Sequence, residues 1–412
     1  MQLKNLQNER IGVCVSGGLD SRTVTRRLLD EGFDVIGFTA DLGQPDETDI
    51  NDVKVRMAAT GVTTHIVDLK DEMAEACFLV LKAQARYDGG YWNSTGIARA
   101  VTVSGLLGAM REQGCTVLSH GATGRGNDQI RFERYTNVLA PDFKVYAPWR
   151  DPGLLEEFPG RREMAAYLRR KGIEADVGPK KRYSTDGNLC GLSHEAEDLE
   201  HLVTPASIVA PIMGVWPQDA PDEVETLTVR VEKGRVVAIN EASVTPLEAM
   251  RQANTIGGRN GIWMLNALEN RIIGTKSRGV YEAPGMEVLG HAIRAVYEAT
   301  MARRAHHFFA QLSTLIGNQI YDGRLYDPTT QAALAAVDSL TEYATGTVEL
   351  GLYKGNIYFQ KLTDCPHSLY SEADASMEAS DGLNPASSQG WLEVHSVEAL
   401  TMAGAGQIPF KR

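Results

Sequence analysis

The chain has 412 residues, of which 43% are hydrophobic and 23% are charged, and its formal net charge is −12 at pH 7. This composition excludes a disordered, collagen-like or coiled-coil chain, and the length predicts two domains with separate cores. The acidic balance disfavours a nucleic-acid partner, because phosphate backbones would be repelled.

The cysteines and the N-terminus indicate the expected compartment. The five cysteines include no C-x-x-C pair, so neither a disulfide framework nor a protein-held metal site is expected. The N-terminal segment is polar, and no apolar run approaches the roughly 18 residues of a membrane span. We therefore expect a cytoplasmic protein with no signal peptide and no membrane partner.

Residues 1–175 alternate short apolar runs with longer amphipathic stretches. Strands are expected at residues 10–15, 35–39, 64–67, 116–119 and 144–147, and helices at residues 20–31, 49–60, 71–87 and 95–112. This alternation predicts an α/β domain in which helices cover both faces of a parallel sheet. Ligands of such domains bind at the carboxyl ends of the strands.

The pattern changes at residues 176–364, which are expected to form an α+β domain. Two hairpins are expected, one from residues 225–231 and 235–240 and one from 347–353 and 356–361; helices are expected at 289–315 and 330–341. Residues 365–412 are rich in Ser, Ala, Gly, Asp and Glu. They are expected to form a tail that either has no fixed structure or packs against another subunit.

The segment V-S-G-G-L-D-S at residues 15–21 follows the first expected strand and opens the first expected helix. Glycines permit a tight turn, and the N–H groups of a helix N-terminus attract phosphate. The segment lacks the lysine of G-x-x-x-x-G-K-[ST] and is not G-x-G-x-x-G. An ordinary strand–turn–helix junction with Asp20 as N-cap is the simpler alternative, but the glycines, hydroxyls and position together favour a phosphate loop.

This loop resembles the S-G-G-x-D-S loop of the N-type ATP pyrophosphatases, which release pyrophosphate and transfer AMP. Within that superfamily the loop alone leaves amidotransferase-type synthetases, tRNA thiolation enzymes and ligases open. Thiolation enzymes are disfavoured because no suitable cysteine pattern or basic balance is present. A glutamine-dependent synthetase is disfavoured because no glutaminase segment is evident, and a non-catalytic binding module because the loop is intact.

A second glycine-rich segment, S-H-G-A-T-G-R-G-N-D-Q-I-R, covers residues 119–131 after another expected strand. Asn127, Asp128 and Arg131 fall within about one helical turn and can converge on one ligand. Arginine can bind a carboxylate bidentately, and an aspartate can accept from an ammonium group, so an amino-acid substrate is expected. A flexible turn with a solvated helix start would explain the glycines but not the paired charges.

Several motifs in the same order resemble the argininosuccinate synthase family. The second glycine segment resembles its S-H-G-A-T-G-K-G-N-D-x-x-R-F-E signature, with Arg125 in place of the lysine. Further matching segments are A-P-W-R at 147–150, Y-S-T-D at 183–186, S-H-E-A at 193–196, E-N-R at 269–271 and K-S-R-G-V-Y-E at 276–282. The likeness runs from about residue 10 to residue 370.

The resemblance implies an ATP-dependent ligase that couples citrulline to aspartate through a citrulline–adenylate intermediate, releasing AMP and pyrophosphate. It implies an ATP-binding domain of the adenine nucleotide alpha hydrolase-like type at residues 1–175, a synthetase domain at 176–364 and an oligomerisation tail at 365–412. Mg²⁺ is implied together with the nucleotide, and a homotetramer as the assembly. No further metal site is implied.

The resemblance also implies residues for each substrate. For ATP these are Ser16, Gly17, Gly18, Asp20, Ser21, Ala40, Gly121 and Thr123. For citrulline they are Tyr91, Asn127, Arg131, Ser184, Ser193, Glu195, Glu269 and Tyr281. For aspartate they are Thr123, Asn127, Asp128 and Asp186.

Some of these residues have a simpler interpretation when they are considered singly. Tyr91 and Tyr281 could be core aromatics, Glu269 a solvated helix carboxylate, and Ser184 a turn cap together with Asp186. The family likeness favours the site for all of them.

The chain departs from the family pattern at Ser21 and Arg22, at Asp41 and at Gly96. These positions surround the expected nucleotide and the expected citrulline tail. A related adenylating ligase that acts on another ureido or amide acceptor is therefore the alternative function.

Overall fold

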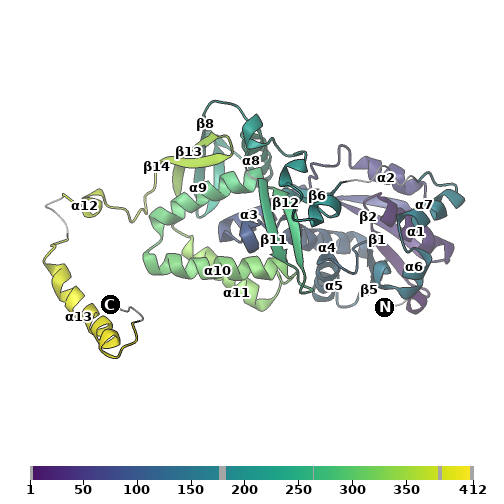
Figure 1. The fold of residues 1–412 in the computed structure, drawn as a ribbon. Coiled ribbons are helices and arrows are strands. Elements are labelled where there is room, and N and C mark those ends of the chain that lie inside the picture. Colours follow the sequence, from purple (N-terminus) through teal and green to yellow (C-terminus); the bar gives the residue numbers. More distant parts are fainter. Residues whose placement is uncertain (1–2, 176–181, 263, 379–382, 409–412) are drawn as a thin grey trace. The chain divides into compact units, whose positions relative to one another are not determined.

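A computed structural model describes residues 3–175, 182–262, 264–378 and 383–408 (Figure 1). The chain forms two compact units, Met1–His367 and Ser368–Arg412. The expected boundary between residues 175 and 176 lies within the first unit and stays a prediction. Figure 1 shows β1 and β2 at one end of this unit and the antiparallel strands β8, β13 and β14 at the other.

A five-stranded parallel sheet in the order β3-β2-β1-β4-β5 forms the N-terminal half, as predicted. Its strands are β1 Arg10–Cys14, β2 Asp34–Asp41, β3 Thr63–Asp68, β4 Val117–His120 and β5 Lys144–Tyr146. Its helices are α1 Leu19–Asp30, α2 Asn51–Ala58, α3 Lys70–Ala83, α4 Ser94–Glu112, α5 Asp128–Leu139, α6 Pro152–Glu157 and α7 Arg161–Arg170. The predicted α/β class is confirmed.

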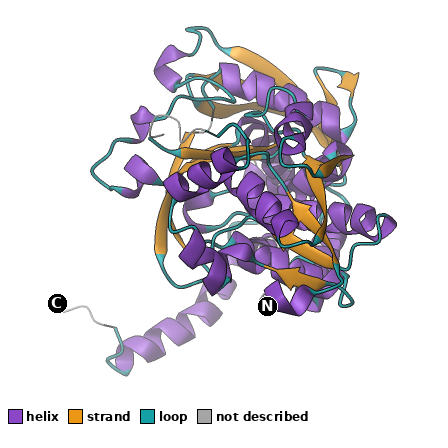
Figure 2. Ribbon diagram, turned by 90° about the vertical axis from the view of Figure 1, so that its right-hand side faces the viewer, coloured by secondary structure: helices purple, strands orange, loops and turns teal. Residues whose placement is uncertain are grey.

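Alternation along β1 explains why helices cover both faces. Ile11 and Val13 point into a core shared with α1 and α2. On the other face, Met110 of α4 lies so close to Gly12 that an added Cβ would be 2.8 Å from its Sδ atom. Glycine is thus the residue that lets α4 approach the sheet. Figure 2, turned by 90° from Figure 1, shows strands with helices on both sides of them.

Helix α3 ends earlier than predicted, at Ala83 instead of residue 87. Gln84 adopts a left-handed conformation, with φ of 48°, and its N–H bonds the carbonyl groups of Leu81 and Val80. A residue in this conformation terminates a helix. The chain then turns into the short segment that leads to α4.

The C-terminal part of the first unit contains two antiparallel sheets. One has the order β10-β9-β8-β13-β14 and the other β11-β12-β7-β6. The strands are β6 Ser184–Asn188, β7 Gly191–Glu195, β8 Glu225–Glu232, β9 Arg235–Ile239, β10 Ala242–Ser243, β11 Met264–Asn270, β12 Lys276–Glu282, β13 Gly346–Tyr353 and β14 Asn356–Thr363. Both predicted hairpins are confirmed, and the pairing of β8 with β13 joins them into one sheet.

The helices of this part are α8 Pro246–Arg259, α9 Pro284–Thr300, α10 Arg303–Tyr321 and α11 Pro328–Leu340. The prediction of a single helix at residues 289–315 was wrong. Met301 and Ala302 take extended conformations, with ψ of 127° and 151°, and separate α9 from α10. The helix predicted at 330–341 is confirmed as α11.

The second unit contains α12 Glu372–Ala375 and α13 Ser387–Gly404. Its described residues are exposed, including the apolar side chains of Trp391, Val394, Val397 and Leu400. Helix α13 therefore has no core of its own within this unit. The predicted packing of the tail on another subunit stays a prediction.

Candidate active site

A cavity of about 370 Å³ lies at the carboxyl ends of the parallel strands, where the sequence predicted a ligand. We call it the loop cavity, after the loop at residues 15–21 that forms one wall. It brings together five of the residues predicted for ATP: Ser16, Asp20, Ser21, Ala40 and Gly121. Gly17 and Gly18 lie in the loop itself, whereas Thr123 lines a second cavity described below.

The loop has the features of an anion site. Gly17 has φ of +72°, and a Cβ there would lie 2.6 Å from the Nε atom of Arg56. Helix α1 starts after Gly18, and no side chain caps its first N–H groups. These N–H groups carry the partial positive charge of the helix and remain available to a phosphate. Asp20 follows within the first turn and is not the N-cap.

The Ser21 hydroxyl, which was expected to contact the ATP phosphates, is already hydrogen-bonded within the loop. It donates to the carbonyl oxygen of Gly18 at 3.1 Å, and the residue is buried against Met57. A basic residue that the sequence analysis missed lies instead beside the loop. Arg56 of α2 donates to Glu47 at 2.8 Å and lies 3.4 Å from the carbonyl oxygen of Ser16.

A second cavity, of about 260 Å³, adjoins the first, and we call it the tyrosine cavity. Gly121, Ala122 and Asp128 line both cavities. The predicted residues that line the tyrosine cavity are Tyr91, Thr123, Asn127, Asp128, Arg131, Ser193, Glu195, Glu269 and Tyr281. A group bound in one cavity can therefore meet a group bound in the other at their common wall.

Two predicted residues lie elsewhere. Asp186 lines the loop cavity. Ser184 is exposed on β6, where it pairs with Glu195 of β7, and it lines neither of the two cavities. The structure thus brings together every predicted amino-acid-binding residue except Ser184 around one pair of cavities.

Glu269 is the centre of a buried cluster of tyrosines. It lies on β11, is 4% exposed and accepts from the hydroxyls of Tyr281 and Tyr321, the latter at 2.8 Å. Burial raises the pKa of Glu269, and the two phenol donors oppose this rise. The interpretation of Glu269 as a solvated helix carboxylate is therefore wrong. The Tyr91 and Tyr281 rings stack with their centroids 4.2 Å apart, both at the cavity wall.

A charged cluster connects the two cavities. Arg99 of α4 pairs with Asp128, at 2.9 Å, and with Asp186, and Arg131 pairs with Asp128 at 2.9 Å. Burial alone would lower the pKa of Arg99, but the two aspartates raise it above its ordinary value. Burial would likewise raise the pKa of Asp128, but Arg99 and Arg131 hold it below its ordinary value. Arg99 was missed by the sequence analysis.

Glu195 differs from the other acidic residues of the site. The structure gives its carboxylate no hydrogen bond or ion pair with any described residue, although Arg271 is near enough to lower its pKa slightly. Burial, with smaller contributions from Asp128 and Asp186, raises its pKa from 4.5 to about 7. This carboxyl group is therefore close to half ionised at neutral pH.

The departures from the family pattern have partners within the protein. Asp41 forms an ion pair with Lys70 at 2.6 Å. Arg22 donates to the carbonyl oxygen of Glu174 at 2.9 Å. A Cβ at Gly96 would lie 3.1 Å from the carbonyl oxygen of Ile320 in α10, so glycine allows α4 and α10 to pack closely.

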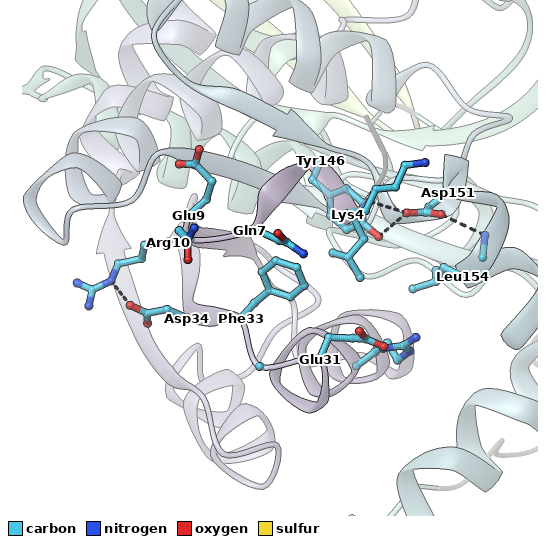
Figure 3. Close-up of a pocket in the computed structure, with 15 residues that line it drawn as sticks. Lys4, Gln7, Glu9, Arg10, Glu31, Phe33, Asp34, Tyr146, Asp151 and Leu154 are labelled. Carbon is cyan, nitrogen blue, oxygen red and sulfur yellow. Dashed lines mark hydrogen bonds and ion pairs between the residues drawn. The ribbon is translucent and has the colours of Figure 1, made fainter.

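A larger cavity, of about 690 Å³, is lined by the first residues of β1 and β2, Arg10 and Asp34, and by Tyr146 and Asp151 (Figure 3). Some of its charged residues pair with one another, as Arg10 and Asp34 do at 2.6 Å. Asp151 accepts from the hydroxyl of Tyr146 and from the N–H of Leu3, both at 3.1 Å. None of the predicted site residues lines this cavity, so it is not the candidate site.

None of the helices in the described part of the chain has the length and apolarity needed to cross a bilayer.

Comparisons with known proteins agree with the geometry. The family described as "Arginosuccinate synthase N-terminal HUP domain" matches residues 10–174, and "Arginosuccinate synthase C-terminal domain" matches residues 183–402. A protein of Rhodopirellula baltica named argininosuccinate synthase is 38% identical over 385 residues, which cover 93% of this chain and 95% of the relative.

Two further relatives carry the same name. The protein of Thermotoga sp. (strain RQ2) is 36% identical over 94% of this chain and 96% of its own length. The protein of Shewanella oneidensis is 34% identical over 97% of this chain and 98% of its own length. With both family regions matched and relatives aligned along nearly the whole chain, this protein belongs to the argininosuccinate synthase family.

Proposed function

We propose that this chain uses ATP to join citrulline and aspartate into argininosuccinate, with release of AMP and pyrophosphate. The observation that supports this most directly is the common wall of the two cavities at Gly121, Ala122 and Asp128. One cavity has an uncapped helix N-terminus suited to phosphates, and the other has carboxylate, amide and guanidinium groups suited to an amino acid.

In the first step the ureido oxygen of citrulline attacks the α-phosphorus of ATP and pyrophosphate leaves. In the second step the aspartate amine attacks the activated ureido carbon and AMP leaves. A neutral ureido oxygen is a weak nucleophile, so alignment of the two substrates and neutralisation of charge provide most of the acceleration. Mg²⁺, bound with the nucleotide, would neutralise the departing pyrophosphate.

The substrate assignments follow the cavities. ATP phosphates would lie on the loop of Ser16, Gly17, Gly18, Asp20 and Ser21, with the rest of the nucleotide against Ala40 and Gly121.

Citrulline would occupy the tyrosine cavity, which is lined by Arg131, by the stacked Tyr91 and Tyr281 and by the carboxyl groups of Glu195 and Glu269. Ser193 and Asn127 would lie at its sides. Aspartate would bind near Thr123, Asn127, Asp128 and Asp186. Ser184 would contribute to citrulline binding only through its pairing with Glu195 across the hairpin.

The alternative acceptor is not favoured. The departures at Arg22, Asp41 and Gly96 are each explained by a contact inside the protein. None of them requires a substrate other than citrulline.

The direct test is to incubate the purified protein with ATP, Mg²⁺ and citrulline, with and without aspartate. We expect AMP and argininosuccinate only when both amino acids are present. Arg131→Ala and Asp128→Ala should abolish the product while the protein remains folded. Failure to form AMP with any combination, although ATP binds, would reject citrulline as the acceptor.

Gly17→Ala is expected to weaken ATP binding by at least about tenfold, or about 1.4 kcal/mol. The added Cβ would lie 2.6 Å from the Nε atom of Arg56, and the alanine would have to adopt φ of +72°, which is unfavourable for any residue with a side chain. Isothermal titration of ATP measures the effect. Gly32→Ala is the matched control, because Gly32 has φ of +83° but nothing within 4 Å of an added Cβ. It should lose some stability and keep its ATP affinity; equal ATP affinities in the two variants would contradict the assignment of the loop.

We further propose a cytoplasmic homotetramer in which residues 365–412 contact a neighbouring subunit, with domains at 1–175 and 176–364. The exposed apolar side chains of α13 support this role for the tail. Light scattering should give a tetramer, and a monomer at micromolar concentration would contradict the proposal.

A further inference from the structure

Tyr321 is a residue of the tyrosine cavity that no motif of the sequence indicated. It is the last residue of α10, it is 1% exposed, and it lines the cavity beside Tyr281 and Glu269. Its sequence neighbours form the end of a helix and a turn, which by themselves suggest only packing. Its importance comes from its contacts.

Three contacts join Tyr321 to three residues that the function requires. Its hydroxyl donates to the carboxylate of Glu269 at 2.8 Å and accepts from the side-chain amide of Asn127 at 2.9 Å. Its carbonyl oxygen accepts from the Nε atom of Arg131 at 2.8 Å. Glu269 lies on β11, whereas Asn127 caps α5 and Arg131 lies in its first turn, so one tyrosine at the end of α10 connects these three elements.

The ring of Tyr321 is itself held in place. It stacks on Tyr87 with the centroids 3.6 Å apart and the planes 13° from parallel. The guanidinium carbon of Arg131 lies 4.8 Å from the centroid of the Tyr321 ring, a distance typical of a cation–π contact. The hydroxyl therefore points at Glu269 and Asn127 without freedom to turn away.

We propose that Tyr321 is a positioning residue for the acceptor amino acid: it orients Glu269 and Asn127 so that they can bind citrulline. This inference rests on the proposed function. Glu269 is held by two phenol donors, Tyr281 and Tyr321, and loss of one leaves a buried carboxylate oxygen without its partner. The carboxylate can then rotate, and its alignment with the substrate is lost.

The test is Tyr321→Phe, which keeps the ring and the backbone carbonyl and removes only the hydroxyl. Citrulline-dependent exchange of labelled pyrophosphate into ATP reports the first chemical step alone. We expect the KM for citrulline to rise by roughly ten- to a hundredfold, the range for a hydrogen bond to a charged group. The KM for ATP should stay within about twofold of the unsubstituted value, since the loop cavity is not altered.

Tyr146→Phe is the matched control. Tyr146 is buried and its hydroxyl also donates to a carboxylate, that of Asp151 at 3.1 Å, but it lines the larger cavity, which contains none of the predicted site residues (Figure 3). It should lose stability without any change in either KM. A merely structural role of Tyr321 predicts that both variants behave alike, with activity following the folded fraction.

A double-mutant cycle with Glu269→Gln tests whether Tyr321 acts through Glu269. We expect the effects on the KM for citrulline to be far from additive, because the second substitution removes the group that the first one orients. Additive effects, or an unchanged KM in Tyr321→Phe, would overturn the inference while leaving the proposed function intact. Absence of citrulline-dependent exchange in the unsubstituted protein would instead reject the proposed function, and this inference with it.

Discussion

Arg99→Met is expected to reduce the rate of argininosuccinate formation by about a hundredfold or more. Arg99 pairs with both Asp128 and Asp186, so its loss leaves two half-buried carboxylates facing each other beside the proposed aspartate site. Arg131 still pairs with Asp128, but Asp186 has no other ion pair among the described residues. Methionine retains most of the volume, so the loss reports the charge.

The same substitution should lower the free energy of unfolding by about 3 kcal/mol, the lower end of the cost of breaking a buried ion pair. Without Arg99 the pKa values of both aspartates rise in the folded state. A carboxyl group with a raised pKa stabilises the fold at low pH and loses that contribution as the pH rises through its folded value. The deficit should therefore be larger at about pH 8 than at about pH 5.

Denaturant unfolding at several pH values, with product assays on the same samples, checks both effects. Arg99→Lys keeps the charge but lacks the planar fork that bridges two carboxylates, so it should recover only part of the activity. A pH-independent deficit, or full activity in Arg99→Met, would show that the cluster is not the link between the two cavities.

Glu195→Gln is expected to remove a titration near neutral pH. In the native protein the pKa of Glu195 is about 7, against 4.5 for the free group. Because its pKa is higher in the folded chain, this residue favours folding below pH 4.5 and loses that contribution as the pH rises through about 7. The glutamine variant should therefore be more stable than the native protein at about pH 8, by at most about 3 kcal/mol, and similar to it at about pH 4.

Citrulline binding by the native protein should improve over the same pH range in which the Glu195 contribution to stability is lost. In the proposed citrulline site the ionised Glu195 carboxylate would accept from a ureido N–H, so the native KM for citrulline should fall as the pH rises through about 7. In Glu195→Gln the KM should be about tenfold higher at alkaline pH and should no longer follow this titration. Glu112→Gln, at an exposed position at the end of α4 that lines neither cavity, should change neither measurement. A native KM without a transition near pH 7 would contradict the role given to Glu195.

Local patterns predicted the N-terminal half of the fold well. Its strands are short apolar runs separated by amphipathic helices, so each element is specified by its own residues. The two hairpins could also be predicted from the sequence, because their turns at residues 232–234 and 354–355 contain glycine. The strands β6 and β12 were not predicted, because S-T-D-G-N and K-S-R-G-V-Y-E are largely polar and become strands through pairing, β6 with the adjacent β7 and β12 with both β11 and the distant β7.

The break between α9 and α10 was missed for a related reason. Met301 and Ala302 include neither proline nor glycine, and the apolar positions continue on both sides of them. Nothing local ends the helix there. Helix α9 packs mainly against α8 and α10 mainly against α11, and such tertiary packing overrides local propensity.

The site residues likewise fall into those that a local motif indicated and those that only the three-dimensional structure brings together. The loop at 15–21 and the segment at 119–131 were found because glycines and polar groups are adjacent in the sequence. Arg56, Arg99 and Tyr321 were missed because each stands alone on a helix and meets its partners only in three dimensions. Ser184 shows the converse: a motif match does not ensure that a side chain faces the cavity.

The hydrogen bonds of Tyr321 with Asn127 and Arg131 connect residues that are 194 and 190 positions apart in the chain. Contacts of such separation form late in folding, since the intervening chain must first be ordered. The tyrosine cavity therefore exists only in forms of the chain in which Asn127 and Arg131 have met Tyr321, and a molecule that binds it selects those forms. By mass action, an amino acid present at about a hundred times its Kd would add about 2.7 kcal/mol to the free energy of unfolding. The acceptor substrate would thus protect the newly made enzyme from unfolding and proteolysis as well as react on it.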